Sequence, residues 1–341
     1  MSIAERIKAA RRSAGMNQRE LGAAVGVSAT AISKYEREEV VPASGTLIRL
    51  GEALDVNIDF FFRQVTVHLS APQYRCHRTL TKKEEHIIHA KVTDWLERYL
   101  EIEMISGIRA DLDLPPREEC RASGMEEVEA VASRVREAWD LGLDPIENVM
   151  DVLEQHGIKV GTIEAPDSFD ALTLYHDERT PVIAVNTAMS GDRQRYNCAH
   201  ELGHLLLRVE HPLDEEAAAH RFAGAFLVPR EMVWKELGKK RHAVDLRELY
   251  LLKHKYGMSM KAWVRRAQDL GVITGVTAKG LYARLNQAKA GREKPAKPVR
   301  HETPTYMHLL ILRAMNEKKI TRSRARELFG GDLPGITAGV E

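Results

Sequence analysis

The sequence predicts a mainly α-helical fold with a small α+β part, divided among several domains. At 341 residues the chain is longer than the ~100–200 residues of one ordinary domain. Most segments have the apolar spacing of amphipathic helices, and only three short stretches, 65–69, 170–176 and 181–187, have strand-like patterns. Hydrophobic residues at 44% and charged residues at 29% indicate a globular protein, which excludes collagen-like chains, low-complexity disorder and small disulfide scaffolds.

Charge and cysteine content limit the partners and the compartment. The 50 Lys and Arg residues against 49 Asp and Glu residues give a formal charge of +1, so only a local basic surface could bind nucleic acid. Cys76, Cys120 and Cys198 lie far apart and form no disulfide framework, which favours a reducing compartment. The N-terminus lacks the apolar core of a signal peptide, and no run of about 18 apolar residues occurs. We therefore expect a cytoplasmic protein without a membrane partner.

The first segment, residues 1–63, has the pattern of five short helices that include a helix-turn-helix. Asn17 is a good N-cap, and Glu20 three residues later completes a capping box. Gly26 ends that helix because glycine accepts the left-handed conformation, and Ser28 caps the next helix. Two helices joined by so short a turn form a helix-turn-helix.

The second helix of this motif is the expected DNA reader. It exposes small or polar side chains that can approach base edges in the major groove. We assign DNA contacts to Ser28, Ala29, Thr30, Ser33 and Lys34 of this helix and its cap, and a phosphate contact to Gln18 at the start of the preceding helix.

About the first 62 residues resemble the Xre/lambda-repressor-like family. The residues that carry the resemblance are Gln18, Leu21, Val27, Ile32, Ser33, Glu36 and Pro42. The resemblance implies a homodimer that binds paired half-sites of a double-stranded DNA operator. A helical bundle that binds protein and no longer touches DNA is the alternative, because the segment has only nine Lys and Arg residues against eight Asp and Glu residues.

Residues 64–123 form a connector with one strand-like stretch and one charged helix around Glu84–Ile105. The apolar residues of this helix could bring two copies of the chain together. They could equally pack on the chain's own domains, and the pattern favours neither role. These residues are Ile87, Ile88, Trp95, Leu96, Tyr99, Leu100 and Ile102.

Residues 124–240 carry the clearest chemistry, His200-Glu201-Leu202-Gly203-His204, inside one predicted helix. Histidines at i and i+4 lie on one helical face, so both rings can bind one Zn²⁺ at about 2.0–2.1 Å. Glu201 lies beside the first histidine and suits a general base for a water molecule at the metal. The two strands before the helix would offer an edge on which an extended substrate peptide can pair.

A hydrolytic zinc site usually takes three protein ligands. Asp214 begins a second helix, antiparallel to the first, on which Glu216 and His220 share one face. We assign Glu216 as the third ligand and His220 as a group behind it or at the transition state. Glu215 and His211 are weaker candidates for the third ligand.

The stretches RQRYNCAHELGHLLL and EEAAAHRFAGAFLVP resemble the ImmA/IrrE-type metallopeptidases, over about residues 125–270. That family has a gluzincin-like site and cuts repressor proteins, usually in response to stress or DNA damage. The resemblance implies a zinc-dependent metalloendopeptidase, and the family's pattern places its glutamate at Glu216. Two positions depart from the pattern: His220 stands where many members have Asn, and Ala218 where a second glutamate is common.

The remaining segments are predicted to be helices, a linker and a C-terminal tail. Residues 241–286 look like a helix-turn-helix-like subdomain, for which packing or substrate docking fits better than DNA reading. Residues 287–304 are rich in Lys, Arg and Pro and indicate a linker. Residues 305–341 predict a helical hairpin and a tail, whose basic run is either a solvated face or a source of phosphate contacts.

Together the patterns predict a DNA-binding transcriptional regulator with a zinc metallopeptidase domain. The peptidase would cleave a protein partner, a repressor or an antitoxin-like protein or the chain itself, in a stress or mobile-element response. The alternative is a regulator without proteolytic activity, whose zincin-like domain senses a metal or a partner.

Overall fold

The computed structural model describes residues 2–56, 58–63, 67, 69–70, 73–76, 80–290 and 297–331. These residues form fifteen α-helices, two short 3-10 helices, a four-stranded sheet and a two-stranded sheet. The predicted class, mainly α-helical with a small α+β part, is therefore confirmed. None of the helices in this part of the chain has both the length and the apolarity that crossing a bilayer requires.

The N-terminal residues fold into four α-helices and one 3-10 helix around a core of their own. The elements are α1 (Ile3–Ser13), α2 (Gln18–Val25), α3 (Ala29–Glu36), α4 (Ser44–Leu54) and η1 (Ile58–Phe62). The fifth predicted helix is thus the 3-10 helix. Asn17 and Glu20 form the predicted capping box of α2, Gly26 ends it at φ 73°, and Ser28 caps α3. A Cβ at Gly22 would lie 2.7 Å from a carbonyl oxygen of the turn, so glycine lets α2 and α3 pack closely.

The middle of the chain is a mixed sheet with the strand order β1-β4-β5-β3. Its strands are β1 (Gln73–Cys76), β3 (Lys159–Ile163), β4 (Phe169–His176) and β5 (Thr180–Asn186). β4 is antiparallel to both β1 and β5, and β3 is parallel to β5. β4 and β5 confirm two predicted strands, whereas β3 was not predicted. Most of the predicted strand 65–69 lies outside the described residues, but Leu69 forms a bridge with His176.

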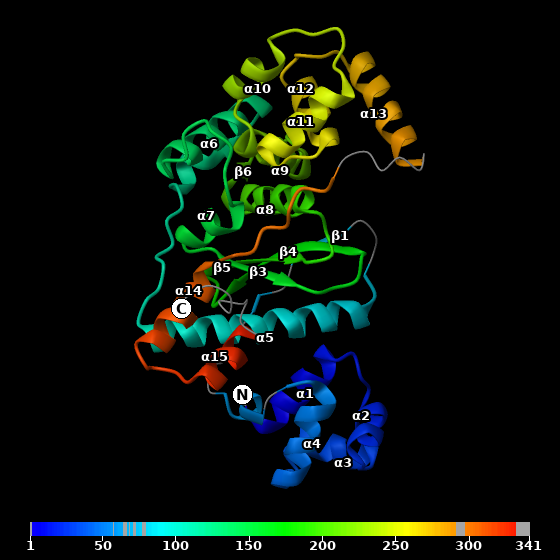
Figure 1. Ribbon diagram of the computed structural model, residues 1–341, viewed down its shortest axis with the longest axis vertical. Coiled ribbons are helices and arrows are strands. Elements are labelled where there is room, and N and C mark those ends of the chain that lie inside the picture. Colours follow the sequence, from blue (N-terminus) through cyan, green and yellow to red (C-terminus); the bar gives the residue numbers. More distant parts are fainter. Residues whose placement is uncertain are drawn as a thin grey trace, which may run out of the picture.

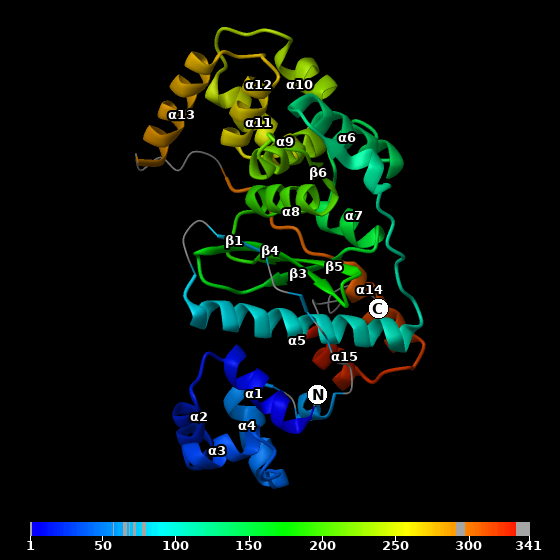
Figure 2. The ribbon, with the colours of Figure 1, turned by 180° about the vertical axis from the view of Figure 1, so that it is seen from behind.

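Two long helices cover the two faces of this sheet, α5 (Lys82–Ser106) and α8 (Gly191–Leu206). Figures 1 and 2 both show the sheet between them. Leu172 and Leu174 of β4 belong to the core on the α5 side, and Ala171 belongs to the core on the α8 side. This alternation is what a strand buried on both faces requires, since successive side chains point in opposite directions.

Further helices extend the α8 side into a second helical layer. They are α6 (Met125–Ala138), α7 (Val149–Gln155), α9 (Glu215–Leu227), α10 (Arg230–Leu237), α11 (Leu246–Tyr256), α12 (Met260–Asp269) and α13 (Gly275–Ala290). The buried Glu129 of α6 forms ion pairs with Arg221 of α9 and Arg266 of α12. Burial raises the pKa of Glu129, but the two guanidinium groups lower it further, so the carboxylate stays charged and links three helices.

The C-terminal helices return to the opposite side of the molecule. α14 (Tyr306–Asn316) and α15 (Arg322–Phe329) pack on α5 and bury Ile311 and Leu328 in its core. Before them, Glu302 forms an ion pair with Arg195 of α8 and accepts hydrogen bonds from the first N–H groups of α7. The two helices agree with the predicted hairpin. Residues 291–296 of the predicted linker and 332–341 of the predicted tail lie outside the described residues.

The helix-turn-helix region contacts this body through α5. Arg6 of α1 is buried, pairs with Glu97 of α5, and donates hydrogen bonds to the carbonyl oxygen of Arg63 at 2.8 and 3.1 Å. Arg63 in turn pairs with Asp94 of α5 at 2.8 Å and with Glu327 of α15 at 3.3 Å. α5 therefore packs within its own chain, and dimer formation through it stays a prediction.

Candidate functional site

Helix α8 presents two histidines on the side that contacts α9. The Nε2 atoms of His200 and His204 lie 3.0 Å apart, one helical turn from each other. His200 is buried, and His204 is partly exposed. The two imidazoles therefore converge on one point from a single rigid helix.

Helix α9 brings a carboxylate to the same point. Glu216 lies in its first turn, and its two oxygens are 3.5 Å from His200 Nε2 and 3.2 Å from His204 Nε2. Asp214 caps the helix by accepting a hydrogen bond from a backbone N–H. A Cβ at Gly203 would lie 3.2 Å from the Phe222 ring and 3.3 Å from the Cα of Ala219. The glycine of the histidine motif therefore allows the close α8–α9 packing that places Glu216.

These three side chains fit a zinc ion. Ligand atoms bound at about 2.0–2.1 Å to a tetrahedral zinc ion lie roughly 3.3–3.4 Å apart. The separations of 3.0, 3.2 and 3.5 Å agree with that spacing. Two imidazoles and one carboxylate are also a donor set found at catalytic zinc sites. Among the described residues no other such group was found, so Glu215 and His211 lie outside it.

Glu201 lies next to this cluster and is held from the sheet. Its carboxylate is buried and accepts a hydrogen bond from the hydroxyl of Thr173 in β4. The sequence analysis missed Thr173, and the available signal was a hydroxyl residue between Leu172 and Leu174 of a predicted strand. Burial raises the pKa of the Cys198 thiol well above its ordinary value, which agrees with a protonated core side chain.

The assigned DNA-reading residues lie on or beside α3. Thr30 and Lys34 are exposed, and Ser28 caps the helix with its hydroxyl. Ala29 and Ser33 are half-buried.

The side chain of Gln18, at the start of α2, forms a hydrogen bond within the helix-turn-helix. Its amide donates a hydrogen bond of 2.8 Å to the Glu36 carboxylate, which also pairs with Arg11. This network joins α1, α2 and α3 and orients the Gln18 side chain.

Two segments of the chain match the models of known families. Residues 153–268 match the model of the IrrE N-terminal-like domain, and residues 7–61 match the model of a helix-turn-helix family. The chain joins a helix-turn-helix domain to an IrrE N-terminal-like domain. It is thus a DNA-binding regulator with a protease-like domain of metallopeptidase type.

Among solved structures, the helix-turn-helix domain is similar to the P22 c2 repressor in complex with synthetic operator 9T in the presence of Tl⁺. The two share 39% sequence identity, and the match covers 18% of this chain and 92% of that chain, with a TM-score of 0.18. A comparison with curated proteins finds no match.

His220 of the IrrE-like domain lies beside the cluster without belonging to it. Its ring centroid is 4.5 Å from that of His200. The Tyr196 hydroxyl lies 3.2 Å from His220 Nδ1 and also donates to the carbonyl oxygen of His220. Tyr196, which the sequence analysis did not single out, therefore orients the His220 ring from α8.

The edge expected for substrate pairing differs from the prediction. The two strands before α8 were expected to offer an edge, but β4 is paired with β1 and β5, and β5 is paired with β4 and β3. The hydroxyl of Ser70 also accepts the backbone N–H of Tyr175 at 2.9 Å. The connector therefore covers the outer edge of β4 with the backbone of β1. The sequence analysis did not predict this strand.

Proposed function

We propose that this chain is a transcriptional regulator whose IrrE-like domain is a zinc-dependent metalloendopeptidase that cleaves a regulator protein. The observation that carries the proposal is the convergence of His200, His204 and Glu216 at spacings that suit zinc. Glu201 beside them supplies the acid–base group that hydrolysis needs.

The chain's own residues have distinct roles in this reaction. Zinc held by the two histidines and Glu216 would lower the pKa of a water molecule toward about 7 and polarise the peptide carbonyl. Glu201 accepts the proton of the attacking water and delivers it to the amine that leaves as the peptide bond breaks. Thr173 holds the Glu201 carboxylate in place through its hydroxyl. His220, which contacts Tyr196 and lies beside His200, would donate a hydrogen bond to the developing oxyanion.

The helix-turn-helix domain would place this activity on a double-stranded DNA operator. Thr30 and Lys34 of α3 are exposed for base and phosphate contacts, and Ser28, Ala29 and Ser33 lie on the same helix or its cap. A homodimer would let two copies of α3 reach paired half-sites. Loss of the cleaved regulator would then change transcription at or near the bound operator.

The test compares wild type with Glu201→Gln in the native host, by mass spectrometry of newly formed protein N-termini and by operator-reporter transcription. We expect Glu201→Gln to retain metal and DNA binding but to lose both the cleaved regulator and derepression. Glu231→Gln, an exposed position on α10, is the matched control and should behave as wild type. Identical N-termini and transcription in wild type and Glu201→Gln would overturn the proposal and leave a sensor of a metal or a partner.

A further inference from the structure

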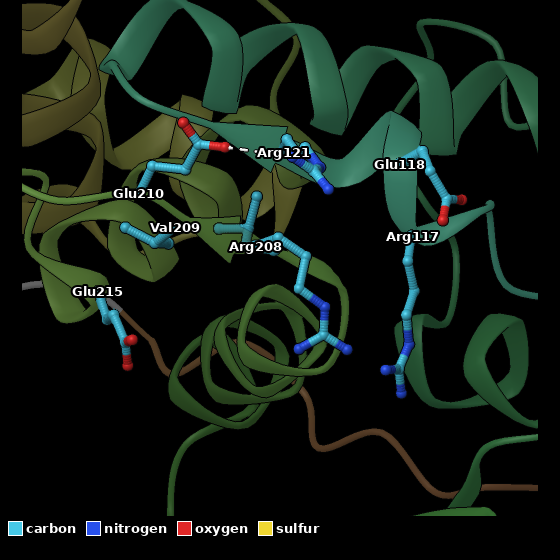
Figure 3. A pocket seen from close by; sticks show the side chains of 8 residues that line it. Arg117, Glu118, Arg121, Arg208, Val209, Glu210 and Glu215 are labelled. Carbon is cyan, nitrogen blue, oxygen red and sulfur yellow. Dashed lines mark ion pairs between the residues drawn. The ribbon is translucent and has the colours of Figure 1, made fainter.

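One pocket is lined by Glu215, the residue before the proposed zinc ligand Glu216. It has a volume of about 390 Å³ and lies between η2 (Arg117–Cys120), β2 (Arg121–Ala122), β6 (Arg208–Val209) and the start of α9 (Figure 3). Its lining residues are Arg117, Glu118, Arg121, Leu207, Arg208, Val209, Glu210 and Glu215. Leu207 caps the C-terminus of α8 three residues after His204, and Glu215 precedes Glu216 in the first turn of α9, so two lining residues are close neighbours of proposed ligands along the chain.

The two-stranded sheet places like charges opposite each other in this pocket. β2 and β6 are parallel, and Arg121 is the direct partner of Arg208, so both side chains project on the same face. Like charges directly opposite destabilise a strand pair. Glu210 offsets only part of this repulsion, because it pairs with Arg121 at 3.7 Å while both side chains are more than half exposed. Binding of an anion between Arg121 and Arg208 would offset their mutual repulsion.

Two of the arginines have unused hydrogen-bonding capacity. Within the part of the chain that the structure describes, the guanidinium groups of Arg117 and Arg208 form neither a hydrogen bond nor an ion pair. Figure 3 shows their side chains pointing in the same direction from η2 and β6, with Glu118 and Glu215 to either side of the two guanidinium groups. The lining carries three glutamates as well as three arginines, so a negative group is favoured only where it contacts the guanidinium groups of Arg117 and Arg208.

We propose that this pocket, here named the arginine pocket, binds an Asp or Glu side chain of the polypeptide that the metal site cleaves. The inference rests on the proposed peptidase function. Each of the two guanidinium groups can bind a carboxylate through two parallel charge-assisted hydrogen bonds. Operator DNA does not account for the pocket, because β6 and α9 lie on the far side of α5 and the sheet from α3 (Figures 1 and 2). The pocket makes acidic residues near the scissile bond a determinant of substrate choice.

The test measures binding separately from cleavage. The full-length Glu201→Gln protein is titrated into two fluorescein-labelled peptides that differ only in Asp-Glu against Asn-Gln, and fluorescence anisotropy is followed at low and high salt. We expect the acidic peptide to bind roughly tenfold more tightly, and this preference to weaken with salt. Adding Arg117→Glu and Arg208→Glu should abolish the preference and favour the same peptide with two lysines instead. Arg247→Glu, a charge reversal at an exposed position of α11, should leave it intact.

The outcomes distinguish the pocket from the peptidase. Equal binding of the acidic and neutral peptides, or an acidic preference that survives the double charge reversal, overturns the arginine pocket. If the pocket is overturned in this way but the wild-type protein cleaves the neutral peptide, the proposed peptidase function is retained without the pocket. A charge-reversible preference in a protein that cleaves neither peptide supports the pocket as a binding site and counts against the peptidase. Both pocket arginines are exposed, so unchanged circular dichroism of the double variant verifies that its fold is intact.

Discussion

Glu154 of α7 connects α7 to α5 and to the start of the C-terminal helix α14. Its side chain is buried, and it accepts hydrogen bonds from the Tyr99 hydroxyl of α5 at 3.0 Å and from the backbone N–H of Tyr306, the first residue of α14, at 3.1 Å. Burial raises the pKa of Glu154 from an ordinary value of 4.5 to about 8. The folded protein therefore keeps this carboxyl protonated at neutral pH.

This shift makes stability depend on pH in a known direction. Between pH 4.5 and 8 the folded state holds the Glu154 proton and the unfolded state has lost it, so stability falls as pH rises. At about 1.4 kcal/mol per pH unit, the loss across this window is about 5 kcal/mol. Glutamine imitates the protonated acid at every pH: its oxygen can accept from Tyr306, and its NH₂ group can donate to Tyr99. Glu154→Gln should therefore match wild type near pH 5 and be several kcal/mol more stable near pH 8.

The assay is urea unfolding followed by circular dichroism at pH 5, 6, 7 and 8, for wild type and variant. The difference between the two removes the contributions of all other titrating groups. Glu137→Gln, at an exposed position of α6, is the control and should show no such trend. A stability difference that stays constant from pH 5 to 8, or a variant that is less stable at pH 8, would show that Glu154 is not a buried protonated acid in the folded protein.

Three further predictions follow from the helix-turn-helix domain and its contact with α5. Thr30→Ala with Ser33→Ala should abolish the sequence-specific gel shift while weak nonspecific binding persists, and an unchanged specific shift would contradict the assignment of α3. Gly22→Ala should cost about 1–3 kcal/mol in thermal unfolding, because the added Cβ forces the two helices apart; wild-type stability would contradict this account. Arg6→Ala should cost about 3 kcal/mol by leaving a buried glutamate without its cation, whereas the exposed Arg12→Ala should cost little, and equal melting of the two variants would count against this ion pair.

Local signals in the sequence predicted the elements that local interactions determine. The capping box of Asn17 and Glu20, the glycine stop at Gly26 and the cap at Asp214 all occur as expected, because each depends on residues within one turn of the helix. The i, i+4 spacing of His200 and His204 follows from helix geometry alone. In each of these interactions, the separation of two residues along the chain determines their separation in the folded protein.

Long-range interactions account for what the sequence analysis missed. The apolar face of α5 was visible in the sequence, but its partners in the sheet and in α14 come from segments more than 50 residues away. β3 carries Lys159, a residue that argues against a buried strand until its ion pair with Glu103 of α5 is seen. The arginine pocket likewise depends on the pairing of Arg121 with Arg208, which no motif announces.

The zinc content of the purified protein tests whether His200, His204 and Glu216 form a metal site. The full-length protein is purified without added metal and analysed for elements, beside a His200→Ala, His204→Ala double variant and the control His211→Ala. The account predicts about one zinc per chain in wild type and in His211→Ala, and none in the double variant. No metal in wild type, even after zinc is offered, would contradict it and leave a DNA-binding regulator whose IrrE-like domain works without hydrolysis.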